Sequence, residues 1–258
     1  MPWAGLRESE ICLAEPLPSF TTTTRTSPTY ARRSSRLRSS GFSGPGKRRP
    51  DAQIGYDSEV AYTDRELRRL FAGLEAGGHL DNTLIVLWSD HGQGLPDHGW
   101  PGHDRQLYDE AVHVPLIMIW PDRIPAGRDF AAPVELMDLV PTVLGLLKLS
   151  PKDTGFEGRD LSEAILGNAE PDREHRMFFQ RSPTDISPTH YGVPRKGPMW
   201  AVQQGDWKYI EAAEEERWEL NDLNSDPGEK NNLFAEQSEI VSQLKSQLET
   251  WLEGRQPS

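Results

Sequence analysis

Apolar residues recur first at helical spacing and then in short runs across the first half of the chain. Residues 57–75 place apolar side chains on one helical face, and Gly77 and Gly78 follow where such a helix would end. Thr83 to Trp88 and Val114 to Trp120 are apolar runs of strand length. Because helical and strand segments alternate, the pattern predicts an α/β fold with a mostly parallel sheet flanked by helices.

A second apolar helix is predicted over residues 135–149, where Pro141 must either kink the helix or lie in its first turn. After Glu170 the pattern changes to short strands separated by Pro and Gly turns. These strands are predicted at Met177–Phe179, Trp200–Val202, Trp207–Ile210 and Trp218–Leu223. A closing helix over residues 235–252 carries apolar residues at helical spacing, and we expect these to be packing residues.

The first fifty residues have a different composition from the rest. They contain nine Lys and Arg against three Glu, and Ser and Thr dominate residues 19–43, which hold almost no apolar side chain. Such a segment buries too little surface to offset its ordering entropy, so we expect it to be disordered. The alternatives are a basic arm for anionic partners, a transit peptide, or the product of a misplaced start or a shifted reading frame.

Charge and cysteine content exclude several protein classes. A formal net charge of −12 argues against nucleic-acid binding, which needs a basic face. The one cysteine, Cys12, excludes an internal disulfide framework. The sequence has no apolar run long enough for a membrane span, and Met1 to Phe20 lack the apolar core of a secretory signal. A cytoplasmic location is therefore expected for the chain as it stands.

The densest group of chemically active residues follows the first predicted strand. Asp90 and His91 come directly after it, and Asp97, His98 and His103 follow within thirteen residues of Asp90. The carboxyl end of a strand is where open α/β sheets bind ligands, and the pair offers one oxygen and one nitrogen donor to a metal. The alternative is an ordinary turn followed by a solvated, histidine-rich loop.

Together these segments resemble the sulfatase family of the alkaline-phosphatase superfamily over about residues 54 to 253. The blocks, in the family's order, are SDHGQGLPDHGWPGH (89–103), LYDEAVHVPLIMIWPDRIPAG (107–127), ELMDLVPTVLGLL (135–147), GDWKYI (205–210) and ELNDLNSDPGEKNNL (219–233). The resemblance implies an incomplete sulfatase-like fold, in which residues 53–170 are the C-terminal half of the catalytic domain. Residues 171–258 would then be the C-terminal subdomain, a small antiparallel sheet plus helix, and residues 1–52 a segment without family match.

The resemblance also implies metal-dependent hydrolysis of a small sulfate ester. Asp90 and His91 stand where the family places two ligands of a divalent cation, usually calcium, although the Asp–His pair also suits manganese or zinc. His98 matches the histidine of an LGxHG segment, with Pro96 in place of the usual Gly. His103 stands where many members have a sulfate-binding lysine, and a protonated imidazole there would bind the ester or protonate the leaving group. His98 and His103 are therefore the candidate catalytic residues.

The family's formylglycine precursor, a C/S-x-P-S/T-R motif, is absent from this sequence. Cys12 is followed by Leu-Ala-Glu-Pro, and no Asp-Asp pair precedes Asp51. Two hypotheses follow. The chain is the C-terminal half of a sulfatase, or of a phosphodiester or phosphonate hydrolase relative, or else it is a non-catalytic remnant or binding protein. Without an activated nucleophile, we expect this chain alone to be inactive.

Overall fold

The computed structural model describes residues 12–13, 50–95, 97–99, 102–103, 105–130, 132–149, 155–181 and 197–255. Most of the segment predicted to be disordered lies outside these ranges. The helices are α1 (Pro50–Ala76), α2 (Asp109–Val112), α3 (Leu139–Leu146), α4 (Ser162–Ile165) and α5 (Ser238–Glu253), with 3-10 turns η5 (Leu80–Asn82), η6 (Leu136–Asp138) and η8 (Ala213–Glu215). The strands are β1 (Cys12–Leu13), β2 (Ile85–Trp88), β3 (Leu116–Ile119), β4 (Met177–Arg181), β5 (Met199–Gln204), β6 (Trp207–Ala212) and β7 (Arg217–Asp222).

The first sheet has three strands in the order β1-β3-β2, and both of its pairings are antiparallel. The predicted mostly parallel sheet is therefore wrong for the described residues, which contain no parallel pair. A parallel pair needs a crossover that carries the chain back along the strands. In the described part of this connection the helix is the four-residue α2, and Leu116 pairs with Trp88, so the chain re-enters the sheet at the end it left.

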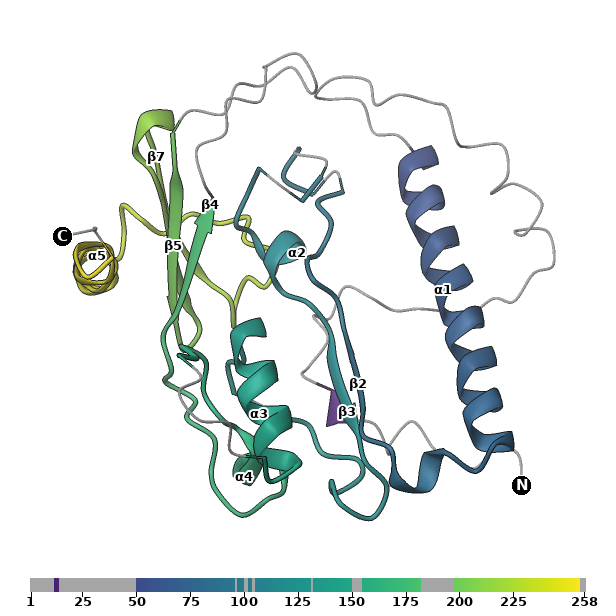
Figure 1. Ribbon diagram of the computed structural model, residues 1–258. Helices are drawn as coiled ribbons and strands as arrows, with labels where there is room; N and C mark the ends of the chain where they lie inside the picture. The colour runs from purple at the N-terminus through teal and green to yellow at the C-terminus, as the bar shows by residue number, and fades with distance from the viewer. Residues whose placement is uncertain are drawn as a thin grey trace.

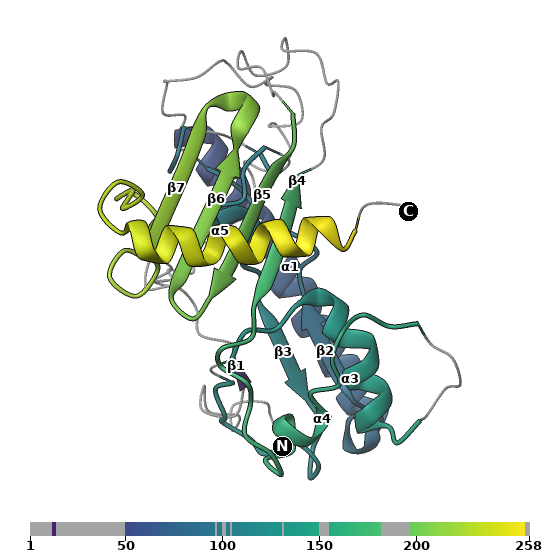
Figure 2. The same cartoon turned by 90° about the vertical axis from the view of Figure 1, so that its left-hand side faces the viewer.

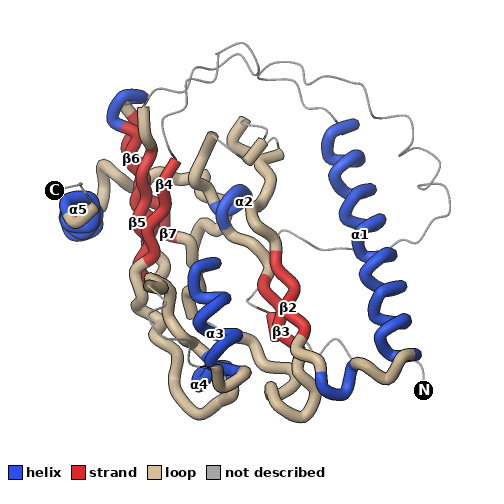
Figure 3. The backbone as a smooth tube through the Cα atoms, in the orientation of Figure 1, coloured by secondary structure: helices blue, strands red, loops and turns tan. Residues whose placement is uncertain are grey.

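Helix α1 spans 27 residues and begins before the predicted range of 57–75. Figures 1 and 3 show it to one side of β2 and β3, opposite α3. Two of its apolar residues, Val60 and Leu70, remain about half exposed. Among the described residues, no helix combines the length and the apolar character needed to cross a membrane.

Helix α3 covers the first sheet with an apolar contact. Met118 of β3 is buried together with Leu139 and Leu146 of α3. Pro141 lies in the first turn of α3, one of the two positions predicted for it. Where η6 leads into α3, the buried Asp138 carboxylate accepts from the Arg159 guanidinium at 2.6 Å, which ties down the segment that leads to α4.

The second sheet has the order β4-β5-β6-β7 with every pairing antiparallel, which confirms the expected antiparallel sheet plus helix. Alternating side chains give it two buried faces. On the outer face, Val202, Tyr209 and Leu220 pack against Leu244 and Leu248 of α5. Figure 2 shows α5 crossing this face.

The inner face of the second sheet supports the segment that leads into α2. Ala201 and Ile210 form a buried cluster with Leu107 and Tyr108 of that segment. Lys208 is fully buried two residues before Ile210, on the same face of β6. The C-terminal sheet therefore packs against the segment before α2 and supports the region that contains the predicted site residues.

Candidate functional site

Asp90 and His91 lie at the end of strand β2, where the chain leaves the sheet. The Asp90 side chain is 84% exposed, and its Oδ1 atom accepts a hydrogen bond from the His91 backbone N–H at 3.1 Å. Gly92 then contacts the α2 region, where its N–H donates to the Ala111 carbonyl at 2.8 Å. A Cβ atom at residue 92 would overlap the backbone carbonyl of Glu110, so this close approach requires glycine.

The His91 ring has one nitrogen available to a ligand. Its Nδ1 atom lies 2.8 Å from the Gly92 carbonyl oxygen, which can only accept, so in the neutral ring Nδ1 carries the proton and Nε2 keeps its lone pair. Nε2 lies 3.8 Å from Asp90 Oδ1. An oxygen donor and a nitrogen donor therefore lie side by side at the strand end.

His103 stacks on His91, with ring centroids 3.7 Å apart and an interplanar angle of 16°. Its Nδ1 atom lies 3.0 Å from Gln93 Oε1. Two backbone hydrogen bonds between Gly94 and Gly102, at 2.8 and 2.9 Å, bring the two ends of the intervening loop together. The fold thus places His103 beside the Asp90–His91 pair.

His98 belongs to the same loop but is held by other elements. Its Nδ1–H donates to Glu110 Oε1 at 2.7 Å, its Nε2–H donates to the Glu229 carbonyl oxygen at 3.0 Å, and its ring stacks on Tyr108 at 3.7 Å. Only 11% of the side chain is exposed. Burial acts to lower the pKa of His98, but the hydrogen bonds to Glu110 and Glu229 outweigh it and raise the pKa above 6.5. With both ring nitrogens facing acceptors, the imidazolium form is favoured.

Three ionisable side chains, Asp109, Lys208 and Glu229, are buried next to His98. Lys208 Nζ lies 2.6 Å from Asp109 Oδ1 and 2.9 Å from Glu229 Oε1, and the Lys208 and Glu229 side chains are almost fully buried. Glu229 Oε2 also accepts from the Asp109 backbone N–H at 2.5 Å. Burial acts to raise the pKa of Asp109, but the Lys208 ammonium lowers it overall. Burial acts to lower the pKa of Lys208, but the two carboxylates raise it overall. Asp109 and Lys208 therefore form an ionised pair at neutral pH.

Sequence reasoning missed Glu110, Lys208 and Glu229 as neighbours of the site. Each lies in a segment that carried the family likeness, LYDE, GDWKYI or DPGEKNNL. The signal was therefore present, but a lysine or glutamate in a polar context is expected on the surface. Only the packing of the second sheet against α2 shows that Lys208 and Glu229 are buried.

The described residues supply two donors for a cation. Among them, no group of three or more His, Cys, Asp or Glu is arranged to hold a metal ion. The Asp90 carboxylate and His91 Nε2 do fit a divalent cation by donor type, since carboxylate oxygen suits calcium and imidazole nitrogen suits manganese or zinc. A site with two protein ligands should bind weakly.

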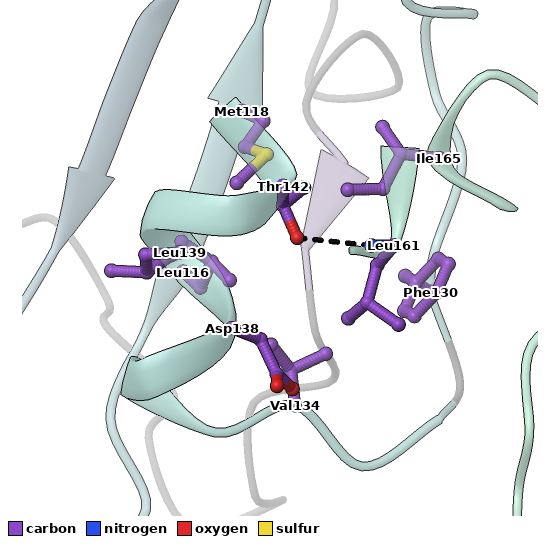
Figure 4. A pocket seen from close by; sticks show the side chains of 9 residues that line it. All are labelled: Leu116, Met118, Phe130, Val134, Asp138, Leu139, Thr142, Leu161 and Ile165. Atoms are coloured by element: carbon purple, nitrogen blue, oxygen red, sulfur yellow. Dashed lines mark hydrogen bonds between the residues drawn. The ribbon is translucent and has the colours of Figure 1, made fainter. Parts of the chain in front are cut away.

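A small apolar pocket of about 40 Å³ lies elsewhere, between β3, α3 and the segment around α4. Its lining residues, shown in Figure 4, are Leu116, Met118, Phe130, Val134, Asp138, Leu139, Thr142, Leu161 and Ile165. The two polar ones are used within the fold, because Thr142 Oγ1 accepts from the Leu161 N–H at 3.1 Å and Asp138 pairs with Arg159. The pocket shares no residue with the histidine-rich region and offers no group for catalysis.

Known sequences support one family assignment. Residues 19–149 match the family model described as Sulfatase, and residues 96–254 match N-sulphoglucosamine sulphohydrolase, C-terminal. The chain is 31% identical over 197 residues to mouse arylsulfatase K, covering 75% of this chain and 34% of that protein. It is also 31% identical over 203 residues to the N-acetylglucosamine-6-O-sulfatase of Bacteroides thetaiotaomicron, again covering 75% of this chain and 34% of that protein. The chain thus spans about a third of the length of these curated relatives.

Solved structures agree with the sequence comparisons. One solved structure shows a protein in complex with its substrate, D-glucosamine-2-N,6-O-disulfate. That protein is similar to this chain at a TM-score of 0.64 and 28% identity, and the match covers 81% of this chain and 43% of that one. The phosphonate monoester hydrolase of Agrobacterium radiobacter is similar at a TM-score of 0.63 and 25% identity, covering 77% and 40%. The fold is therefore sulfatase-like and partial. Since the two family models each match half of the chain or more, this protein belongs to the sulfatase family of the alkaline-phosphatase superfamily.

Proposed function

We propose that Asp90, His91, His98 and His103 form part of a site that hydrolyses sulfate esters. The observation that carries this proposal is the stack of His103 on His91, directly beside the exposed Asp90 carboxylate. This arrangement places candidate metal donors and a candidate sulfate-binding group at one strand end. Family membership supplies the reaction class.

In this proposal Asp90 and His91 hold a divalent cation, with calcium favoured and manganese or zinc as alternatives. When bound, the cation supplies positive charge to the sulfate oxygens. His91 is oriented for this role by its Nδ1–H bond to the Gly92 carbonyl, which leaves Nε2 free to bind.

His103 is the group proposed to meet the ester. Gln93 fixes its Nδ1 atom, so Nε2 is left to face the substrate. As an imidazolium, His103 would donate from Nε2 to a sulfate oxygen or to the leaving-group oxygen. His98 was also predicted to be catalytic. Its two hydrogen bonds to protein acceptors instead favour a role in holding the loop.

We also propose that the 258-residue chain alone has no sulfatase activity. The sequence contains no match to the formylglycine precursor motif, and its one cysteine is followed by Leu-Ala-Glu-Pro. Removing the nucleophile from a hydrolase typically lowers kcat by ~10⁴ or more, because the remaining electrostatic groups stabilise only part of the transition state. A nucleophile from outside this sequence would be needed for turnover.

A second candidate is a phosphonate or phosphodiester hydrolase. It is supported by the structural likeness to the Agrobacterium radiobacter phosphonate monoester hydrolase. Phosphonate and sulfate esters are both tetrahedral anions, so the Asp90, His91 and His103 groups would suit either. The substrate decides between the two candidates.

The test compares two proteins, both produced together with a formylglycine-generating enzyme. One is the 258-residue chain, and the other is a version extended at its N-terminus with a sequence that carries the C-x-P-S-R and Asp-Asp motifs. Each is assayed with an aryl sulfate, a 6-O-sulfated glucosamine and a phosphonate monoester, with calcium or manganese. We expect hydrolysis of a sulfate ester by the extended protein only, and a loss of at least about 100-fold in its Asp90→Ala and His103→Ala variants. Full activity in either variant would overturn the assignment of that residue, and turnover by the shorter chain would reveal a nucleophile within it.

A further inference from the structure

The loop that brings His103 to His91 is anchored at its far side by the C-terminal subdomain. His98 makes this connection, since its Nε2–H donates to the Glu229 carbonyl at 3.0 Å. The two residues are 131 positions apart in the sequence. The bond therefore joins the loop after β2 to the turn after β7.

The Glu229 carbonyl is directed at His98 by an unusual backbone conformation. Glu229 has φ of 50°, a left-handed conformation that is unfavourable for a non-glycine residue. Its carboxylate compensates by contacting Lys208 at 2.9 Å and the Asp109 N–H at 2.5 Å. The buried charges thus hold Glu229 in the one conformation that presents its carbonyl to the loop.

A second set of bonds shapes the same turn from its exposed side. Asp226 Oδ2 accepts from the Lys230 N–H at 2.6 Å and the Asn231 N–H at 2.7 Å. The Glu229 N–H donates to the Asp226 carbonyl at 3.0 Å. The Asp226 side chain is partly exposed and its carboxylate bonds to backbone N–H groups, so it shapes the turn without contributing a charge to the buried cluster.

We propose that Glu229, held by Lys208 and Asp109 and by the turn that Asp226 caps, is a positioning residue for the site. It fixes His98, and through the loop closed by Gly94 and Gly102 it fixes His103 against His91. The inference rests on the proposed function only in treating that stack as part of a hydrolytic site.

The test follows individual imidazole rings by NMR in the 258-residue chain labelled with ¹⁵N-histidine. The charged and titratable groups facing His98 are Glu110 of α2, Tyr108, which directly precedes α2, and Glu229. Lys208 contacts the Glu229 carboxylate. In the wild type, both ring N–H protons of His98 should be protected, and ring protons of His91 and His103 should show a mutual NOE.

Asp226→Ala should loosen the turn without removing a buried charge. We expect Nε2–H exchange at His98 to accelerate at least about tenfold, since the acceptor is displaced. We also expect the pKa of His98 to fall and the NOE between His91 and His103 to weaken. Glu229→Gln should change the same three quantities, the exchange rate, the pKa of His98 and the NOE, in the same direction and by more.

The matched control is Asp222→Ala. Asp222 caps the adjacent turn, because its carboxylate accepts from the Asn224 and Ser225 N–H groups and from the Ser225 hydroxyl. Its backbone carbonyl accepts from the Asp226 N–H, a bond that an alanine would keep. A purely structural role would lower Tm in the Asp222 and Asp226 variants alike and leave the His98 signals unchanged, which would overturn the proposal. If Glu229→Gln does not fold, the Asp226→Ala result decides. A change at His98 without sulfatase activity in the extended protein would leave this proposal standing and count against the proposed function alone.

Discussion

The imidazole rings of His91 and His103 lie stacked at 3.7 Å, although twelve positions separate them in the sequence. The antiparallel bridge between Gly94 and Gly102 produces this contact by closing the loop. The stack joins a candidate metal donor to a candidate sulfate-binding group. It also orients the two rings without using His91 Nε2, which stays available.

The first prediction concerns cation binding at Asp90. Titration with calcium and with manganese, followed by calorimetry or by Mn²⁺ relaxation, should show weak binding that Asp90→Ala abolishes. Asp97→Ala is a matched control, because Asp97 also precedes a histidine but the nitrogens of His98 are both engaged. We expect Asp97→Ala to bind like the wild type. Equal binding by the wild type and Asp90→Ala would contradict the assignment.

The second prediction concerns Gly92. A methyl group there would overlap the Glu110 carbonyl, which is backbone and cannot rotate away. Gly92→Ala should lower the free energy of unfolding by about 3 kcal/mol or more, or prevent folding. Gly99→Ala is the control, since Gly99 has φ of 74° with open space around it and should cost only about 1–2 kcal/mol. Urea denaturation of both variants measures the difference. Similar small losses in both would contradict the prediction, because they would show that the backbone at residue 92 can move away from the Glu110 carbonyl.

Local sequence patterns predicted most of the individual elements. The strand before Asp90, the helix containing Pro141 and the four C-terminal strands all occur close to their expected ranges. Asp90, His91 and His103 could be placed together because they are close in sequence and follow one strand. Strand direction was predicted wrongly, because the connection to Leu116 contains a four-residue helix instead of a full crossover. The anchoring of His98 was also beyond prediction, since it depends on a contact between residues 131 positions apart.

The third prediction concerns pH and the His98–Glu110 pair. The pKa of His98 is raised in the folded protein, so the stability from this pair is complete below the unfolded value of 6.5 and is lost as pH rises through the folded value. Glu110→Gln should therefore destabilise the protein by about 1–3 kcal/mol near pH 6 and by less at higher pH. Urea denaturation from pH 5.5 to 9 measures this trend. The exposed Arg68–Asp64 pair provides a control, because Asp64→Asn should show no such trend. A loss for Glu110→Gln that does not change with pH would mean that His98 keeps one charge state from pH 5.5 to 9, which would contradict this prediction.

The last prediction concerns the buried Lys208. Lys208→Met would leave the Asp109 and Glu229 carboxylates without their ammonium partner in a buried environment, and breaking a buried ion pair from one side costs about 3–5 kcal/mol. Asp109 has a lowered pKa in the wild type, so its contribution is present above the unfolded value of 3.8 and is lost as pH falls below it. The difference between wild type and Lys208→Met should thus be largest at neutral pH and shrink toward pH 3. Lys245→Met is the matched control, since Lys245 pairs with Glu249 at 3.9 Å on the exposed side of α5 and should change stability by less than about 0.5 kcal/mol. Equal effects of the two substitutions at pH 7 would show that Lys208 does not hold the C-terminal sheet to the site.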